Sequence, residues 1–294
     1  MSSLLDIQGL QLGFKGLSGV TQVLHGIDLS IGKGERVALV GESGSGKSVT
    51  ARIILGLLQE IRSARVTGAI EFEGRDISTM SARQRFALRG TEMSMIFQDP
   101  TSSLNPTFTI GHQFAEVMRR RQPKLDQRAC DVRATEMLAE VSIPDPARVL
   151  SAYPFQLSGG MNQRVMIAMA LVNNPNLLLA DEPGTALDVS VQAKTLRLMH
   201  DLVDRHGTAV LFISHNLGVV REFADRVYVI YRGRIVEEGP THAIFNNPGH
   251  AYTRALMDAV PRITGAGLPD VPEVSEDFLA PMVRHDTPKK GGSA

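Results

Sequence analysis

A glycine-rich loop in the first quarter of the chain carries the residue types that bind phosphate groups. Residues 41–48 read GESGSGKS and fit the pattern G-x-x-x-x-G-K-[ST] at each fixed position. Glycines let backbone N–H groups turn toward phosphates, and the helix expected after the loop adds partial positive charge at its N-terminus. We expect Lys47 to reach the β- and γ-phosphates of a nucleotide and the Ser48 hydroxyl to bind Mg²⁺. The expected nucleotide contacts are Gly41, Ser43, Gly44, Gly46, Lys47, Ser48 and Val49.

A pair of acidic residues follows an apolar segment farther along the chain. Asp181 and Glu182 come directly after residues 177–180, which read LLLA. Taken alone, the pair could equally be two solvated acids at the end of a buried strand, but the upstream phosphate loop favours a nucleotide triphosphatase. We expect Asp181 to hold Mg²⁺ through water and Glu182 to polarise the attacking water. The sequence contains no Asn-Lys-x-Asp element of the kind that reads guanine, so ATP is favoured over GTP.

A second anion-binding element lies between these two motifs. Residues 157–160 read LSGG and stand at the start of an expected helix, where the Ser158 hydroxyl and the amides of Gly159 and Gly160 can face a phosphate. A plain helix N-cap with flexible glycines is the alternative for such a segment in isolation. Two separate phosphate-binding elements make sense if two copies of this kind of chain face each other and each completes the other's nucleotide site.

Composition excludes several classes of protein. The chain has 294 residues, 31 Lys and Arg against 31 Asp and Glu, and one cysteine. Balanced charge argues against a whole-chain nucleic-acid binder, so we expect no nucleic-acid partner. Cys130 alone can form no intramolecular disulfide and no cysteine-ligated cluster, which fits a reducing compartment. The N-terminus does not resemble a signal peptide, and no apolar run approaches the roughly 20 residues that span a bilayer. We therefore expect a soluble chain that could sit on a membrane through partners.

Short apolar segments alternate with helical stretches over most of the length, which is typical of an α/β protein with a largely parallel sheet. Between about residues 110 and 150 the strand pattern disappears, which predicts a helical insertion. A short helix should follow the turn at residues 246–249, and we expect the chain after Pro261 to be loosely ordered. Strands are expected at 8–12, 23–31, 36–40, 68–72, 93–97, 177–181, 209–214, 227–231 and 234–238, and helices at 47–58, 110–121, 126–141, 160–173, 191–206 and 217–224.

The order of these motifs resembles the ATP-binding cassette of ABC transporters. Residues 157–164, LSGGMNQR, are similar to the family signature, LSGG followed by a Gln-Arg pair. The resemblance implies a P-loop NTPase core of the RecA-like type, with an antiparallel β subdomain and an inserted α-helical subdomain at about 99–165. The whole ATPase domain would cover residues 1–240.

The resemblance also assigns roles to single residues. Gln98 is similar to the glutamine that senses Mg²⁺ and the water, and His215 to the switch histidine that contacts the γ-phosphate. Asp188 is similar to the aspartate that crosses the dimer interface. Phe14 would stack on adenine, although a core phenylalanine is an equal alternative. Catalysis thus falls to Glu182, His215 and Gln98; metal binding to Ser48, Gln98 and Asp181; and nucleotide binding, beyond the phosphate loop, to Ser158, Gly159, Gly160, Phe14 and Asp188.

Three further segments resemble the ATPases of oligopeptide, dipeptide and nickel importers. These are residues 97–111, the Tyr153-Pro154 pair, and residues 247–256, which would belong to a C-terminal extension at 241–262 ahead of a tail at 263–294. The start of the first helix, SVTA, is more similar to the D-type member of the D/F pair. Gly184 stands where the family usually has threonine, and Asn162 stands where it usually has a basic residue.

The function that this resemblance implies is ATP hydrolysis that powers import of peptides or related solutes. The implied partners are a second ATPase subunit, with an F-type paralogue expected, two integral membrane permeases, and a solute-binding protein that acts through the permeases. The place would be the cytoplasmic face of the cell membrane. The alternatives are an ATPase of a soluble multi-enzyme complex similar to the phosphonate lyase, a cassette that acts in DNA repair or translation, and a nucleotide-binding scaffold without turnover. The sequence does not identify the cargo or distinguish a homodimer from a heterodimer.

Overall fold

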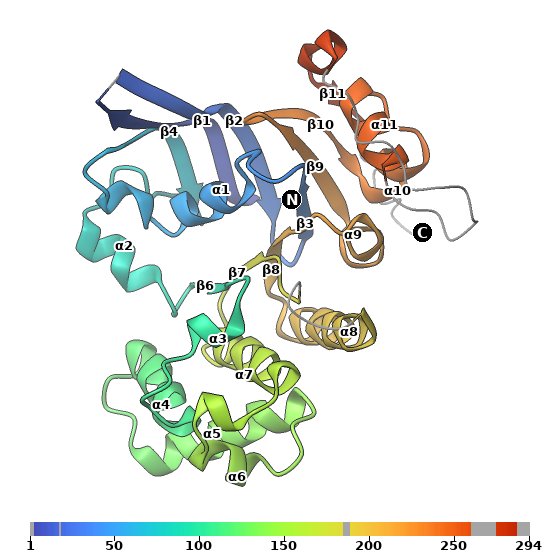
Figure 1. Ribbon diagram of the computed structural model, residues 1–294. Coiled ribbons are helices and arrows are strands. Elements are labelled where there is room, and N and C mark those ends of the chain that lie inside the picture. The colour runs from blue at the N-terminus through green and yellow to red at the C-terminus, as the bar shows by residue number, and fades with distance from the viewer. Residues whose placement is uncertain (1–2, 18, 185–188, 260–274, 287–294) are drawn as a thin grey trace, which may run out of the picture.

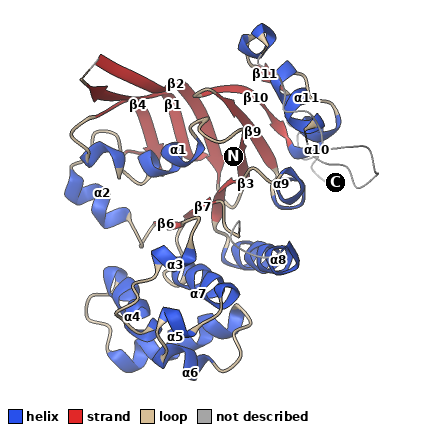
Figure 2. Ribbon diagram, viewed as in Figure 1, coloured by secondary structure: helices blue, strands red, loops and turns tan. Residues whose placement is uncertain are grey.

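The computed structural model describes residues 3–17, 19–184, 189–259 and 275–286, and a seven-stranded sheet forms its centre. The strand order among those residues is β11-β10-β9-β3-β8-β7-β6 (Figures 1 and 2). The five strands from β9 to β6 are parallel, whereas β10 is antiparallel to β9. The strands are β3 (Arg36–Val40), β6 (Met93–Ile96), β7 (Leu177–Asp181), β8 (Ala209–Ile213), β9 (Arg226–Tyr231), β10 (Arg234–Pro240) and β11 (Val283–Arg284).

The N-terminal part of the chain forms most of a second sheet, which is antiparallel. Its order in the described ranges is β2-β1-β4-β5, and β1 pairs with both β2 and β4. The predicted strand 8–12 covers only the middle of β1, 23–31 covers most of β2, and 68–72 covers the second half of β4, whereas β5 was not predicted. The two sheets confirm the expected fold class, a P-loop NTPase core with an antiparallel β part. The strands are β1 (Ser3–Gly16), β2 (Gly19–Gly32), β4 (Ala64–Phe72) and β5 (Arg75–Asp76).

Strand β3 separates two apolar cores, because alternate side chains of a strand point to opposite faces. Val37 and Leu39 join the core shared with the antiparallel sheet and helix α1 (Lys47–Ile54). Ala38 and Val40 join the core shared with the helices on the other face. Every residue of β7 and β8 is buried, as expected for central parallel strands covered on both faces. This burial on both faces explains their apolar sequences, in which Asp181 at the end of β7 is the one charged residue.

A group of helices lies between β6 and β7 and forms the lower part of Figure 1. The predicted helices 110–121, 126–141 and 160–173 correspond to α4, α5 and α7 within one or two residues. Thr109, Asp126 and Ser158 cap the N-termini of these three helices through side-chain oxygens. The elements are α3 (Pro100–Ser103), α4 (Ile110–Arg121), α5 (Gln127–Glu140), α6 (Pro146–Ser151), the 3₁₀ turn η2 (Pro154–Gln156) and α7 (Gly159–Leu171).

One of the remaining helices is shorter than predicted, and some were not predicted at all. Helix α1 ends at Ile54 rather than at residue 58, because Gly56 has a φ of 73° and turns the chain toward η1 (Leu58–Glu60). Helix α2 (Ala82–Leu88) is unpredicted, since it buries only Leu88 and has no apolar stripe. No helix among the described residues is both long and apolar enough to span a membrane. The others are α8 (Val189–His206), α9 (Leu217–Phe223), α10 (Thr241–Asn246), α11 (Ala251–Asp258) and η3 (Glu276–Leu279).

The expectation of a loosely ordered tail is wrong for residues 275–286. Strand β11 adds to the edge of the main sheet by pairing in parallel with β10. Phe278 is only 7% exposed, because it packs edge-on against the rings of Tyr231 and Tyr252. The edge pairing and the aromatic contact together dock this segment onto the main sheet.

We predict that Phe278→Ala undocks residues 275–286. Truncating a buried phenylalanine costs about 3–5 kcal/mol, and brief limited proteolysis followed by mass spectrometry should then show cleavage in this segment at least about tenfold faster. Leu279→Ala is the matched control, because Leu279 is 68% exposed. Equal cleavage rates in the two variants would contradict the docking role of the Phe278 ring.

Candidate functional site

The phosphate loop, residues 41–48, joins the end of β3 to the start of α1. Gly41 approaches β9 so closely that a Cβ atom there would lie 2.1 Å from the carbonyl oxygen of Ile230. Gly46, the residue before α1, has a φ of 112°, and its Cβ would lie 2.5 Å from Leu24 Cδ2. Only glycine fits both positions, so the two fixed glycines of the motif are explained by the packing of the loop against β9 and β2.

Lys47 is buried inside this loop. Its Nζ donates hydrogen bonds to the carbonyl oxygens of Gly41 at 2.8 Å and of Glu42 at 2.7 Å. Burial lowers the pKa of the Lys47 ammonium, while the nearby carboxylates of Glu182 and Asp181 act in the opposite direction. The ammonium thus lies at the N-terminus of α1, where an anionic phosphate would offset the free energy lost when the ammonium was dehydrated.

Asp181 and Ser48 meet across the loop. The Ser48 hydroxyl donates to Asp181 Oδ1 at 2.8 Å, which joins the first turn of α1 to the end of β7. Burial raises the pKa of the Asp181 carboxyl, and the hydrogen bond from Ser48 opposes the rise. A hydroxyl and a carboxylate in contact present two hard oxygen donors, which is the donor type that Mg²⁺ prefers.

The Glu182 carboxylate lies between two other predicted residues. Gln98 Nε2 donates to Glu182 Oε2 at 3.2 Å, and His215 Nδ1 lies 3.1 Å from Glu182 Oε1. The three residues follow β6, β7 and β8, so the carboxyl ends of three adjacent parallel strands bring them together. Glu182 has a φ of 49°, a conformation that residues other than glycine seldom adopt, and strain of this kind is found at functional sites.

A cavity of 480 Å³ lies over the phosphate loop and reaches these side chains. Val23 of β2 also borders it, although we did not predict Val23, because a single apolar residue in a strand carries no distinguishing pattern. The lining residues are Val23, Ser43, Gly44, Gly46, Lys47, Ser48, Val49, Gln98, Glu182 and His215. Of the predicted set, the structure therefore brings the phosphate loop, Gln98, Glu182 and His215 to one cavity, with Asp181 buried behind Ser48.

Gly41 and Asp181 do not line the cavity but contact its lining residues Lys47 and Ser48, and five further predicted residues are not placed in it. Phe14 lies on β1 opposite Thr21 of β2 and packs against the core that the antiparallel sheet shares with α1. Its role as the adenine-stacking ring stays a prediction. Asp188 lies outside the described residues. The three residues Ser158, Gly159 and Gly160 stand at the N-terminus of α7 and are not part of the lining.

The N-terminus of α7 exposes two of the residues that we predicted to face a phosphate. Ser158 and Gly159 are exposed, and the Ser158 hydroxyl accepts a hydrogen bond from the Met161 amide at 3.3 Å. Asn162, which replaces a basic residue, is buried and donates to the Pro154 carbonyl at 3.0 Å. Asn162 therefore anchors the turn before α7, and its amide faces the protein interior.

Gly184 fits its own position well. Its φ is 115°, and a Cβ there would lie 3.2 Å from Gln192 Cγ. The threonine that the family usually has would be strained in this backbone conformation, which favours the glycine found here.

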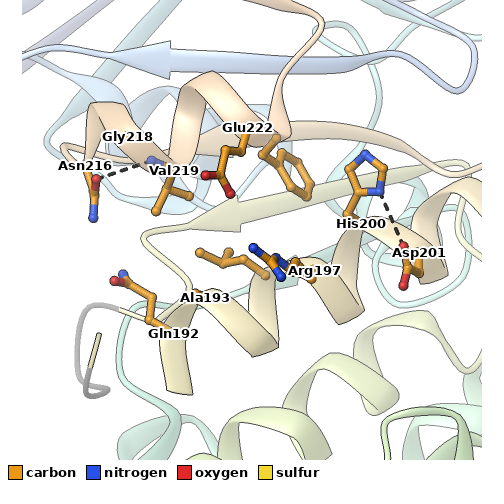
Figure 3. A pocket seen from close by; sticks show the side chains of 11 residues that line it. Gln192, Ala193, Arg197, His200, Asp201, Asn216, Gly218, Val219 and Glu222 are labelled. Carbon is orange, nitrogen blue, oxygen red and sulfur yellow. Dashed lines mark hydrogen bonds and ion pairs between the residues drawn. The ribbon is translucent and has the colours of Figure 1, made fainter. Parts of the chain in front are cut away.

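A larger cavity of 730 Å³ lies between α8 and α9 (Figure 3). Apolar side chains such as Leu196 and Phe223 line much of it, and its charged groups include Arg197, Asp201 and Glu222. It contains none of the phosphate-loop residues. Size alone does not make it the reactive site, because the convergent donors and carboxylates lie around Lys47.

Comparison with known proteins gives two family matches. Residues 24–185 match the family described as ABC transporter, and residues 236–276 match the family described as oligopeptide/dipeptide transporter, C-terminal region. Two solved structures of the cassette MJ0796 share 27% identity with the chain and cover 81% of it and 98% of their own length. Their TM-scores are 0.72 for a dimeric post-hydrolysis state bound to ADP and Pi and 0.71 for a dimer.

Similar sequences have been given names that refer to peptides. A probable peptide ABC transporter ATP-binding protein of Sinorhizobium fredii is 48% identical over 95% of this chain and 84% of its own length. The oligopeptide transport ATP-binding protein OppD of Bacillus subtilis is 44% identical over 96% and 79%. The dipeptide transport ATP-binding protein DppD of Bacillus subtilis is 43% identical over 96% and 84%.

We predict that Asp181→Asn stabilises the nucleotide-free protein at pH 7. The folded state disfavours the Asp181 carboxylate, since burial raises its pKa, so ionisation costs stability above the ordinary aspartate pKa. The asparagine carbonyl can still accept from Ser48, and the melting temperature should rise by about 2–4 °C at pH 7. The gain should shrink toward about pH 4, where the unfolded carboxyl also protonates. A lower melting temperature at pH 7 would contradict the cost of this buried charge.

Proposed function

The chain belongs to the ABC transporter family, and on that premise we propose that it hydrolyses ATP to power import of peptides or related small solutes across a membrane. The observation that carries this proposal is the Glu182 carboxylate, which lies 3.2 Å from the Gln98 amide and 3.1 Å from the His215 ring beside a complete phosphate loop. A carboxylate in this position can accept a proton from water that attacks the terminal phosphate.

Each residue of the cavity has a separate part in the proposed reaction. Glu182 is the general base, and Gln98 and His215 fix the direction of its carboxylate. The Lys47 ammonium moves from the loop carbonyls to the phosphates and offsets the negative charge that develops during transfer. The amides of the phosphate loop and the N-terminus of α1 hold the phosphate chain in place.

The donor set around Ser48 fits Mg²⁺. Ser48 Oγ and Asp181 Oδ1 are already in contact at 2.8 Å, and the side-chain amide of Gln98 lies at the same cavity. We propose that Ser48 and Gln98 bind the ion and that Asp181 holds it through water. The ion, when bound with ATP, neutralises phosphate charge and orients the terminal phosphate.

A second ATPase subunit is part of the proposal. Within one chain the exposed Ser158 and Gly159 stand apart from the cavity over Lys47, so the nucleotide keeps an uncovered side. We propose that the partner's equivalent of this helix N-terminus, together with Asp188, completes the site when two subunits close. The dimeric state of the cassettes with the same fold supports this arrangement. The partner proposed here is an F-type paralogue.

The proposed cargo and location rest on the relatives. Relatives named for peptide, oligopeptide and dipeptide transport cover nearly the whole chain, and residues 236–276 match the C-terminal region of such transporters. We therefore propose an ATPase domain at 1–240, with helices inserted at about 99–165, and an importer-type extension at 241–262. The subunit would lie on the cytoplasmic face of the membrane, bound to two permeases that receive solute from a binding protein.

We predict that Glu182→Gln abolishes turnover but not nucleotide binding. The amide retains the size and planar shape of the side chain and one acceptor oxygen, but it cannot take a proton from water, so phosphate release should fall about 10²–10⁴-fold. The measurement is steady-state phosphate release by the complex assembled with its membrane subunits. Glu222→Gln, at an exposed position beside the cavity between α8 and α9, is the control and should keep its rate. A Glu182→Gln complex with wild-type turnover would exclude Glu182 as the base.

Co-purification tests the transport role separately. We expect the tagged full-length chain, isolated from membranes in mild detergent, to carry two integral membrane proteins and a second ATPase identified by mass spectrometry. Recovery with soluble enzymes from the membrane-free fraction would instead support an ATPase of a multi-enzyme complex. Recovery of neither, with no phosphate release, would support a nucleotide-binding scaffold.

A further inference from the structure

A tyrosine near the C-terminus touches the phosphate loop. The Tyr252 hydroxyl, on α11, accepts a hydrogen bond of 3.0 Å from the backbone N–H of Glu42, which lies 210 positions earlier in the chain. Tyr252 is only 3% exposed, and burial raises its pKa to about 12. The hydroxyl is therefore neutral at ordinary pH and is shielded from competing water.

The contacted peptide group is also the one that holds Lys47. The N–H of Glu42 and the C=O of Gly41 belong to one peptide unit, and the Gly41 oxygen accepts from Lys47 Nζ at 2.8 Å. In a trans peptide the N–H and the C=O point in opposite directions. Tyr252 and Lys47 thus hold the same peptide from opposite sides. Rotation of this peptide would break both hydrogen bonds at once.

The position of Tyr252 is fixed by its surroundings. Its ring centroid lies 4.3 Å from that of Tyr231 and 5.5 Å from that of Phe278. His250 caps the start of α11 by accepting from the Tyr252 amide at 3.2 Å. The fully buried Glu237 of β10 in turn accepts from the His250 amide at 3.1 Å. Contacts to β10, a strand of the main sheet, therefore fix the start of α11 and with it the position of the Tyr252 hydroxyl.

We propose that Tyr252 is a positioning residue for nucleotide binding: its hydroxyl sets the Gly41–Glu42 peptide, and through that peptide the Lys47 ammonium. The proposal rests on the proposed function, since Lys47 acts on the phosphates of ATP. It links the C-terminal extension directly to the nucleotide site. Loss of the hydroxyl removes the partner of the Glu42 N–H, so the Gly41–Glu42 peptide, and with it the Gly41 carbonyl, is held less firmly.

The test compares two full-length variants that each remove one hydroxyl from the same aromatic cluster. Tyr252→Phe removes the contact to Glu42, whereas Tyr231→Phe removes a buried hydroxyl that makes no hydrogen bond with the described residues. We expect Tyr252→Phe to bind ADP and ATP about 2- to 10-fold more weakly, the range of one neutral hydrogen bond, and Tyr231→Phe to bind like the wild type. Hydrogen exchange resolved at the Glu42 amide should also be faster in Tyr252→Phe alone.

Each other outcome overturns the inference. Wild-type affinity in Tyr252→Phe would show that the hydroxyl does not position Lys47. Equal losses in both variants would assign the effect to packing of the cluster, as would a melting temperature of Tyr252→Phe more than about 5 °C below that of Tyr231→Phe. A wild-type protein that binds neither nucleotide would instead refute the proposed function, so the two failures are distinguishable.

Discussion

The burial of charge at the carboxyl edge of the main sheet is the constraint on which the rest of the structure depends. Lys47 and Asp181 both lose hydration. Burial lowers the pKa of Lys47 and raises the pKa of Asp181, so in each case it favours the neutral form. The loop carbonyls and the Ser48 hydroxyl offset part of this cost. These partners hold only while β3 and β7 stay in register on either side of β8. An anionic phosphate beside Lys47, and in the proposed reaction a cation beside Asp181, would offset the rest of this cost.

The two cores keep that register. Successive side chains of β3 alternate between them, so a slip of one residue would move Val37 and Leu39 out of one core and into the other. Strand β3 then leads directly into Gly41, where no side chain fits against β9. The sheet therefore fixes the position of the phosphate loop. Gly41 is held against β9, and its carbonyl oxygen in turn binds the Lys47 ammonium six residues later. The packing of β3 between the two cores therefore also sets the geometry of the phosphate loop.

The sequence predicted most elements that carry strong periodicity or a fixed motif. The phosphate loop, Asp181 and the residues Gln98, Glu182 and His215 were predicted because their types and order are distinctive, and the structure places them at one end of the sheet. Helix α2 and strand β11 were not predicted, since each depends on tertiary contacts rather than on its own pattern. Val23 and the contact from Tyr252 to Glu42 could not be predicted for the same reason: one residue in a strand or helix does not reveal its distant neighbour.

The same reasoning explains why the two predicted phosphate-binding elements of the chain do not meet within one subunit. Asn162 holds the N-terminus of α7 against the preceding turn, and most of the other residues of α7 are buried in the core. Its amides cannot turn toward Lys47 of the same chain without breaking that packing. Ser158 and Gly159 are accordingly exposed and do not line the cavity over Lys47 within the described residues. In the proposed pair of subunits, closure would therefore bring two separately packed elements together as a rigid-body movement, the form of motion that could be passed on to the proposed membrane subunits.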